Sequence, residues 1–298
     1  MGKSQTEKPP PPAPPVSDPD AIVSITALAS DGDGIARTAD GRVVFVEGAV
    51  PGDRVVLGGL ARRRKVLRAR IDRLVEASAD RVEPACLHFG RCGGCVWQHV
   101  RYATQLEAKR RNLQAALERI GGLRLAAEIA IVASPDPLHY RARTRVVEAE
   151  GGVGYRRRAS NDAMRVEVCP VLVPAAQTAL ADLGREVAAE QTAAGRPASV
   201  ADREWTITAG SAGPARVFDA AARSAEVELE VLGERLRVGG PGFVQGNALL
   251  WDRFAAEVRD RCLGAPSAPV PASAAPPRRF VELYAGIGFL TLPLARAG

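Results

Sequence analysis

The sequence predicts a multidomain α+β protein with an OB-like β-barrel at the N-terminus, a central β-rich domain and the start of a Rossmann-like α/β domain. Three observations predict this architecture. Short apolar runs alternate with Gly and Asp turns between residues 21 and 77, three cysteines follow in "CLHFGRCGGC", and the last residues read as an apolar run, a Gly-x-Gly turn and a helix. The chain has 298 residues, which is enough for two or three domains.

The composition and the N-terminus limit where the protein works. A hydrophobic share of 46% is typical of a globular protein. Because there is no run of about 18 apolar residues and no apolar segment after the first lysines, we expect neither a membrane span nor a signal peptide, and therefore a cytoplasmic location. Residues 1–19 are rich in proline and lack the apolar groups needed to fold, so we expect a disordered tail there.

Residues 20–77 are expected to form the barrel. Their apolar runs are "IVSITAL", "RVVFVEGAV", "RVVLGGL" and "KVLRARIDRLV", and the turns between them are "DGDG", "DG" and "PGD". Strands of four to seven residues between such turns are typical of a small antiparallel barrel.

Positive charge gathers in two places, within a net charge of +6. Arginine forks match phosphate oxygens, so each group fits a surface that follows a polyanion, although a solvated surface explains either group equally well when it is taken alone. The first group, on the last strands of the barrel, is our candidate for nucleic-acid binding and contains Arg62, Arg63, Arg64, Lys65 and Arg68. The second group contains Arg141, Arg143, Arg145, Arg156, Arg157 and Arg158.

The cysteines indicate a metal site. Thiols in the cytosol stay reduced, and clustered cysteines there are more often metal ligands or catalysts than disulfides. The candidate ligands are Cys86, Cys92 and Cys95 in C-x5-C-x2-C spacing, and Cys169, which precedes Pro170. Four thiolates suit a four-iron four-sulfur cluster or a zinc ion. The presence of a single short C-x2-C hook favours the cluster, and zinc stays open.

Residues 78–242 are expected to form the central domain around this metal site. An amphipathic helix is predicted over residues 102–120, with an apolar stripe of Leu106, Leu113, Leu117 and Ile120, and it ends at Gly121-Gly122. Residues 128–242 are expected to be mainly β around one helix over residues 174–189. A further helix in "LLWDRFAAEVRDRCL" precedes a linker, "GAPSAPVPASAAPPRR".

Residues 243–298 are expected to begin a nucleotide-binding domain. The segment "FVELYAGIG" reads as an apolar strand that enters a tight turn at Gly286 and Gly288, and "FLTLPLARAG" then opens a helix. A single Gly-x-Gly is a weak signal on its own. A sheet of this class needs several parallel strands, so we expect the chain to be a fragment or its last segment to need a partner.

Taken in order, these pieces resemble the RNA uracil-5-methyltransferase family that carries a 4Fe-4S cluster and an N-terminal TRAM domain. The most specific parts are the cysteine spacing and the pair of "FVQGN" and "LYAGIGF". The resemblance implies that Cys86, Cys92, Cys95 and Cys169 hold a 4Fe-4S cluster. It also implies that the residues binding S-adenosyl-L-methionine are Gln245, Tyr284, Gly286, Gly288 and Phe289, and that the helix over residues 102–120 packs on the catalytic domain.

The family's reaction, as the resemblance implies it, begins when a cysteine thiolate adds to C6 of a uracil turned out of the RNA. C5 then takes the methyl group, and a carboxylate removes the C5 proton. These groups lie in family segments beyond the glycine turn, so no catalytic residue is assigned here and we expect the chain to be inactive alone. The implied substrate is 23S-type ribosomal RNA rather than transfer RNA, and the implied state is a monomer. The alternative is a non-catalytic RNA-binding protein with a structural iron-sulfur or zinc site.

Overall fold

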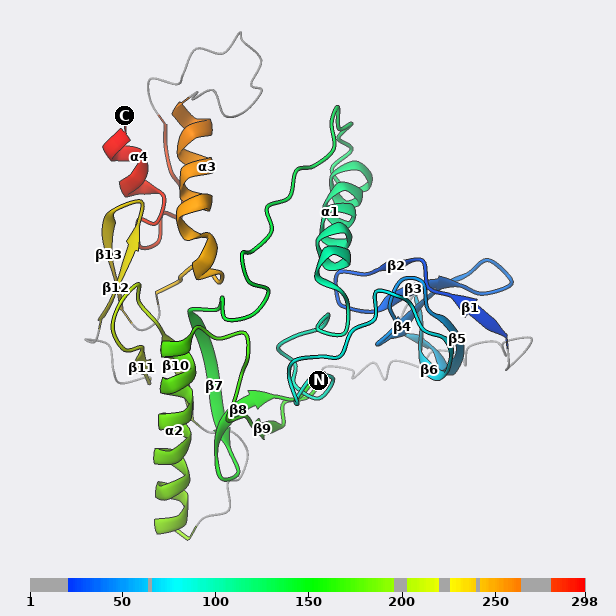
Figure 1. Cartoon of the computed structure of the whole chain (residues 1–298), viewed down its shortest axis with the longest axis horizontal. Helices are drawn as coiled ribbons and strands as arrows, with labels where there is room; N and C mark the ends of the chain where they lie inside the picture. Colours follow the sequence, from blue (N-terminus) through cyan, green and yellow to red (C-terminus); the bar gives the residue numbers. More distant parts are fainter. Residues whose placement is uncertain are drawn as a thin grey trace, which may run out of the picture. The chain divides into compact units, whose positions relative to one another are not determined.

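A computed structural model describes residues 21–63, 66–195, 203–219, 226–239, 242–263 and 280–297 (Figure 1). These residues form two compact units. The first unit contains residues up to Gly90 together with Cys95–Ala133, and the second contains Arg91–Gly94 together with the residues from Ser134 onward. The tail predicted over residues 1–19 and the linker predicted over residues 264–279 lie outside the described residues.

The first unit contains a curled six-stranded sheet in the order β1-β5-β6-β4-β3-β2. All neighbouring strands are antiparallel except β4 and β6, which run parallel. Val44 and Val46 of β4 and Val55 of β5 are fully buried, and the residues between those of β4 are more exposed, as expected for strands with one face on a core. The strands are β1 (Ile22–Ser24), β2 (Ala27–Leu28), β3 (Gly34–Arg37), β4 (Val43–Glu47), β5 (Arg54–Arg63) and β6 (Val66–Glu76).

Two of these strands are longer than the sequence predicts. β5 has 10 residues and β6 has 11, where strands of four to seven residues were expected. The register between them shifts between Gly58 and Ala61, and Gly59 has a φ of 60°, which only glycine adopts without strain. Such a bulge bends a long hairpin so that it curls, and glycine in the middle of β5 therefore marks a bend and not the end of a strand.

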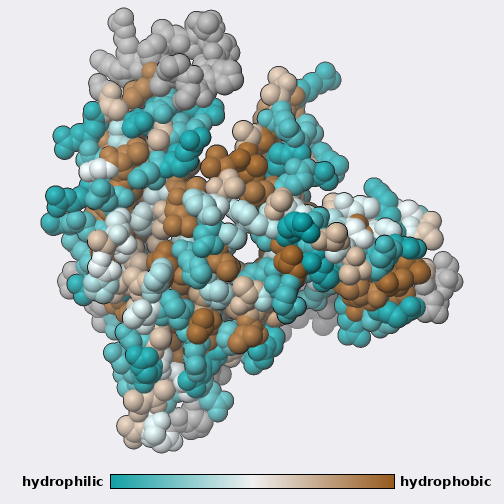
Figure 2. Space-filling view, viewed as in Figure 1, coloured by the Kyte–Doolittle hydropathy of each residue, from teal (hydrophilic) through white to brown (hydrophobic). Residues whose placement is uncertain are grey.

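The helix expected over residues 102–120 is present as α1 (Tyr102–Arg119). The Gln105 side chain donates to the carbonyl oxygens of Trp97 and Val100 at 3.0 and 2.8 Å, and Ala108 is the buried residue of the helix. The expected apolar stripe is not a buried face, because Leu113 is 49% exposed and Ile120 is 88% exposed. Hydrophobic surface is visible beside α1 in Figure 2. Packing of this helix on a catalytic domain stays a prediction.

The second unit contains a five-stranded antiparallel sheet in the order β11-β10-β7-β8-β9, and α2 packs across one of its faces (Figure 1). α2 (Pro174–Ala193) confirms the helix expected near residues 174–189 and starts with proline, which suits the first helical position. Leu180 and Val187 of α2 share a core with the sheet. The strands are β7 (Arg143–Ala149), β8 (Gly152–Arg156), β9 (Ala163–Arg165), β10 (Glu204–Thr208) and β11 (Arg216–Phe218).

The rest of the second unit comprises a hairpin and three short helical segments. The hairpin is β12 (Glu226–Val231) with β13 (Glu234–Gly239), and the helical segments are η1 (Ala248–Leu250), α3 (Trp251–Leu263) and α4 (Thr291–Ala297). The strand expected over residues 280–285 is not formed, although the helix after it is. A strand needs a neighbour to take up its backbone hydrogen bonds, and no strand within the described residues pairs with this segment.

Candidate functional site

The cysteine loop is attached to the sheet of the second unit at Cys92. Cys92 forms a β-bridge with Arg157, the Gly93 amide donates to the Arg156 carbonyl at 3.1 Å, and the Arg158 amide donates to the Arg91 carbonyl at 2.8 Å. A Cβ atom added to Gly93 would lie 3.3 Å from the Arg156 oxygen, so glycine permits this close approach. Arg156, Arg157 and Arg158 of the second basic group therefore hold the cysteine loop through contacts of their backbone.

Cys92 and Cys169 lie on the same face of this sheet. Side chains alternate along a strand and directly opposed residues share a face, so Tyr155, Arg157 and Cys92 are on one side. Burial raises the pKa of the Tyr155 hydroxyl, and the adjacent Cys169 thiol, to which it is hydrogen-bonded, raises this pKa further. The Cys169 amide donates to the Gln177 side chain of α2 at 2.8 Å, which fixes its backbone.

Cys86 and Cys95 belong to the first unit. The Cys86 amide donates to the Gln98 side chain at 3.1 Å, and none of the five cysteines forms a disulfide. Within the described part of the chain, no three His, Cys, Asp or Glu side chains gather in a way that could hold a metal ion. The second unit thus brings Cys92 and Cys169 to one face, and the full set of four ligands stays a prediction.

Gln245 and Phe289, two of the predicted cofactor residues, are connected through Trp251. The indole Nε1 of Trp251 donates to the Gln245 carbonyl at 3.0 Å, and the Trp251 and Phe289 rings meet edge to face with centroids 6.5 Å apart. Phe254 packs on Phe289 at 6.2 Å. Sequence reasoning did not single out Trp251. The available signal was its place as the first large apolar residue of the helix that follows "FVQGN".

The glycine turn has the backbone conformation that its sequence requires. Gly286 and Gly288 have φ values of 59° and 81°, and Tyr284 also has a positive φ, 60°, although it is not glycine. This conformation is strained for Tyr284, whose side chain is fully exposed. A Cβ added to Gly242 would lie 3.6 Å from Ile287 Cγ2, so the segment before Gln245 lies against this turn.

The candidate nucleic-acid residues of β5 and β6 have different surroundings. Arg62 is exposed at the end of β5, and Arg63 belongs to the same strand. Arg64 and Lys65 lie outside the described residues. Arg68 donates to Asp31 at 2.5 Å and to Asp33, so two carboxylates already balance its charge and it holds the turn that contains them.

Comparison with known proteins completes this picture. Residues 22–71 match the TRAM domain family. The chain is 40% identical over 168 residues to the 23S rRNA (uracil(1939)-C(5))-methyltransferase RlmD of Halomonas elongata, a match that covers 55% of the chain and 34% of that protein. It is 31% identical over 313 residues to the RlmD of Alkalilimnicola ehrlichii, which covers 92% of the chain and 68% of that protein.

The chain belongs to the RNA (uracil-C5) methyltransferase family.

A solved structure has a similar fold. It is the Pyrococcus abyssi tRNA (uracil-54, C5)-methyltransferase in complex with S-adenosyl-L-homocysteine, with a TM-score of 0.64 and 19% identity over 93% of this chain and 71% of that one. The match to the Halomonas relative spans about a third of that relative's length, 34%. No helix in the described ranges is long and apolar enough to cross a membrane.

Proposed function

We propose that this chain supplies the RNA-binding barrel and part of the methyl-donor site of an S-adenosyl-L-methionine-dependent RNA (uracil-C5)-methyltransferase that acts on 23S-type ribosomal RNA in the cytoplasm. The observation that carries the proposal is the 31% identity to the Alkalilimnicola 23S enzyme over 92% of the chain. The TRAM match over residues 22–71 supports RNA as the partner. No catalytic residue is assigned to this chain.

S-adenosyl-L-methionine supplies the methyl group in this proposal, and Gln245, Tyr284, Gly286, Gly288 and Phe289 shape its pocket. The glycine turn fits a ligand, because a Cβ added to Gly286 or Gly288 would meet no atom closer than 3.8 Å. The exposed Tyr284 ring and the Gln245 amide are the groups that contact the ligand. Phe289 is buried against Trp251 and anchors the turn instead of touching the ligand. The complex of the Pyrococcus relative with S-adenosyl-L-homocysteine supports this ligand class.

We also propose that Cys86, Cys92, Cys95 and Cys169 hold a 4Fe-4S cluster, with zinc as the competing metal. The chemistry of the donor set fits, because cysteine thiolates are the usual ligands of such a cluster, none of the four cysteines forms a disulfide, and Gly93 lets the loop approach the sheet. Cys92 and Cys169 already share a face beside Tyr155. When bound, the cluster would cross-link the cysteine loop to the segment that contains Cys169. Its role in this proposal is structural.

The barrel residues Arg62, Arg63, Arg64, Lys65 and Arg68 are proposed to contact RNA phosphates, with the protein acting as a monomer. The exposed Arg62 supports this contact more strongly than Arg68, whose charge is balanced by Asp31 and Asp33.

A chimera tests the function. The part of the Alkalilimnicola enzyme that this chain does not match is appended to the chain, and the product is incubated with S-adenosyl-L-methionine and a 23S-type transcript. We expect 5-methyluridine in the digested transcript by mass spectrometry. A transfer RNA transcript in parallel tests the substrate class, and methylation of that RNA alone would overturn the ribosomal assignment. If the folded chimera binds RNA but neither binds S-adenosyl-L-homocysteine nor forms 5-methyluridine, the chain is a non-catalytic RNA-binding protein.

A further inference from the structure

The sheet of the second unit has one face without α2, and arginines gather on it. Val146, Trp205 and Ile207 are buried in the core that α2 shares, and side chains alternate along each strand. Arg143 and Thr208 therefore point to the opposite face. The strand register places Arg143 of β7 directly opposite Thr208 of β10, and Thr208 directly opposite Arg216 of β11. The three residues form a row across neighbouring strands, which are about 4.8 Å apart.

Arg143 is a half-buried cation without a counter-charge. Its side chain makes no hydrogen bond or ion pair within the described residues, and its Nε atom is buried without an acceptor. Burial lowers the pKa of the Arg143 guanidinium, and the neighbouring Arg145 lowers this pKa further. Withdrawing a charge from water without pairing it is costly. An anion that binds here would recover this cost.

Two other arginines of the same sheet are already paired. Arg145 pairs with Glu204 at 3.0 Å, and Arg165 pairs with Glu167 at 2.5 Å. Arg216 is exposed and, like Arg143, has no ion pair with any described residue. Two unpaired guanidinium groups thus flank a single residue, Thr208.

Thr208 adds a polar group that lacks a partner. It is 1% exposed, and its hydroxyl oxygen has no hydrogen-bond partner in the described structure. A buried hydroxyl without a partner is unfavourable, and it becomes favourable once it donates to an oxygen atom. Two arginines with a hydroxyl between them provide hydrogen-bond donors, and phosphate oxygens accept hydrogen bonds from such groups.

The row lies beside the segment proposed to bind the methyl donor. Arg141, two residues before Arg143, forms a β-bridge with Asn247, and the Ala248 amide donates to the Tyr140 carbonyl at 2.8 Å. This end of β7 is therefore joined to "FVQGN". A nucleic-acid backbone bound on the arginine row would pass close to that segment.

We propose that Arg143, Thr208 and Arg216 form a phosphate-binding site for the RNA substrate, on the face of the sheet that α2 does not cover. This inference rests on the proposed function in two respects, which are the identity of the RNA and the position of the site beside the methyl donor. It is separate from the basic residues of the barrel and would orient the RNA near the donor.

The test compares charge-removing variants in equilibrium RNA binding. The variants are Arg143→Gln, Arg216→Gln and the near-isosteric Thr208→Val, and the control is Arg185→Gln, an exposed arginine on α2 that pairs with Asp182. Binding of a 23S-type transcript is followed by fluorescence anisotropy from 50 to 300 mM salt. Each arginine variant should weaken binding about fivefold to tenfold and reduce the slope of log K against log salt by about 0.7 to 0.9. The control should change affinity less than about twofold, as expected for an exposed paired charge.

A stability measurement separates this site from a structural role. Removing an unpaired buried charge should leave the Tm of Arg143→Gln equal to or above that of the wild type, and inorganic phosphate should raise the Tm of the wild type but not of this variant. The proposal of this phosphate-binding site would be overturned if the folded Arg143→Gln and Arg216→Gln variants kept the affinity and the salt slope of the wild type. That result would leave the proposed function intact. Weakened RNA binding in these variants, in a chimera that forms no 5-methyluridine, would support the site and remove the function.

Discussion

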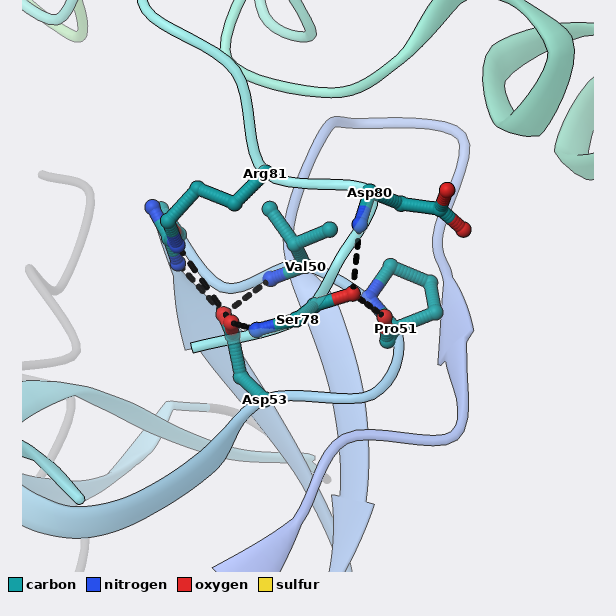
Figure 3. A network of polar contacts seen from close by, with 7 residues as sticks. Val50, Pro51, Asp53, Ser78, Asp80 and Arg81 are labelled. Atoms are coloured by element: carbon teal, nitrogen blue, oxygen red, sulfur yellow. Dashed lines mark hydrogen bonds and ion pairs between the residues drawn. The ribbon is translucent and has the colours of Figure 1, made fainter. Parts of the chain in front are cut away.

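The carboxylate of Asp53 is fully buried and pairs with the guanidinium of Arg81, across the start of β5 and the segment that follows β6 (Figure 3). Asp53 also accepts hydrogen bonds from the amides of Val50 at 2.7 Å and Ser78 at 2.9 Å. Arg81 donates in addition to the Gly48 carbonyl at 3.0 Å. This network fixes the direction in which the chain leaves β6 toward Cys86.

Replacing Asp53 with Asn should destabilise the first unit. The change leaves Arg81 partly buried without its counter-charge, and breaking a pair of this kind costs about 3 kcal/mol. Urea unfolding followed by circular dichroism measures the effect. Asp72→Asn on the exposed face of β6 is the matched control and should change stability by less than about 0.5 kcal/mol. Equal midpoints for the two variants would show that the Asp53–Arg81 pair contributes nothing.

The same pair makes stability depend on pH in the acid range. Burial alone would raise the pKa of Asp53, but Arg81 and the two backbone amides outweigh it and hold this pKa below its ordinary value. A lowered pKa in the folded state means that the stabilisation is complete above the unfolded pKa of about 3.9 and is lost as the pH falls through the folded value. The Tm difference between wild type and Asp53→Asn should therefore shrink below about pH 4. A difference that stays constant down to pH 2 would contradict this account.

The parts that sequence predicted well are those governed by local pattern. The helices at residues 102–120 and 174–189, and the β-rich regions before and after the cysteines, follow from apolar periodicity and turn residues. The length of the β5–β6 hairpin was missed because strands of four to seven residues were expected, and the run "RVVLGGL" does not show that a bulge lets the strand continue past its glycines. The prediction of a strand at residues 280–285 was wrong. A strand forms only where a neighbouring strand pairs with it, and a local sequence pattern contains no information about that neighbour.

In the candidate sites too, features set by residue type could be predicted, and features set by tertiary contacts could not. The positive φ of Gly286 and Gly288 could be predicted from residue type, and the structure has it. The role of Trp251 could not be predicted, because its hydrogen bond to the Gln245 carbonyl depends on how α3 folds back on the preceding segment. The pairing of Arg68 with Asp31 and Asp33 joins residues more than 30 positions apart, and charge clustering alone did not distinguish it from a free arginine.

Trp251 should strengthen binding of the methyl donor. Trp251→Phe removes the hydrogen bond to the Gln245 carbonyl and keeps an aromatic ring, whereas Trp251→Leu also removes the edge-to-face contact with Phe289. We expect affinity for S-adenosyl-L-homocysteine, measured by calorimetry, to fall about fivefold in the first variant, in line with a lost hydrogen bond of about 1 kcal/mol. The second variant should lose more. Unchanged affinity in both variants would separate Trp251 from the site.

The glycine turn offers a matched pair of substitutions. Gly288 has a φ of 81°, so Gly288→Ala is strained even though its Cβ would meet no atom closer than 3.9 Å, and we expect a loss of about 1 to 2 kcal/mol of stability. Gly246→Ala, in "FVQGN", has no positive φ and no atom within 4 Å of the added Cβ, so it should have little effect. Thermal unfolding and binding of S-adenosyl-L-homocysteine check both variants. Equal losses in the two would contradict the backbone argument.

The metal proposal is tested by comparing cysteines that differ in their proposed role. The chain and its variants Cys92→Ser, Cys169→Ser and Cys262→Ser are purified without oxygen, and iron, sulfide and zinc are quantified. Cys262 lies in α3 and is the one cysteine outside the proposed ligand set, so its variant should retain about four irons per chain. Loss of either Cys92 or Cys169 should abolish the brown colour and the iron, because an incomplete thiolate set holds the cluster poorly. Stoichiometric zinc without sulfide would replace the cluster with a zinc site. Iron retained equally in all three variants would exclude Cys92 and Cys169 as ligands.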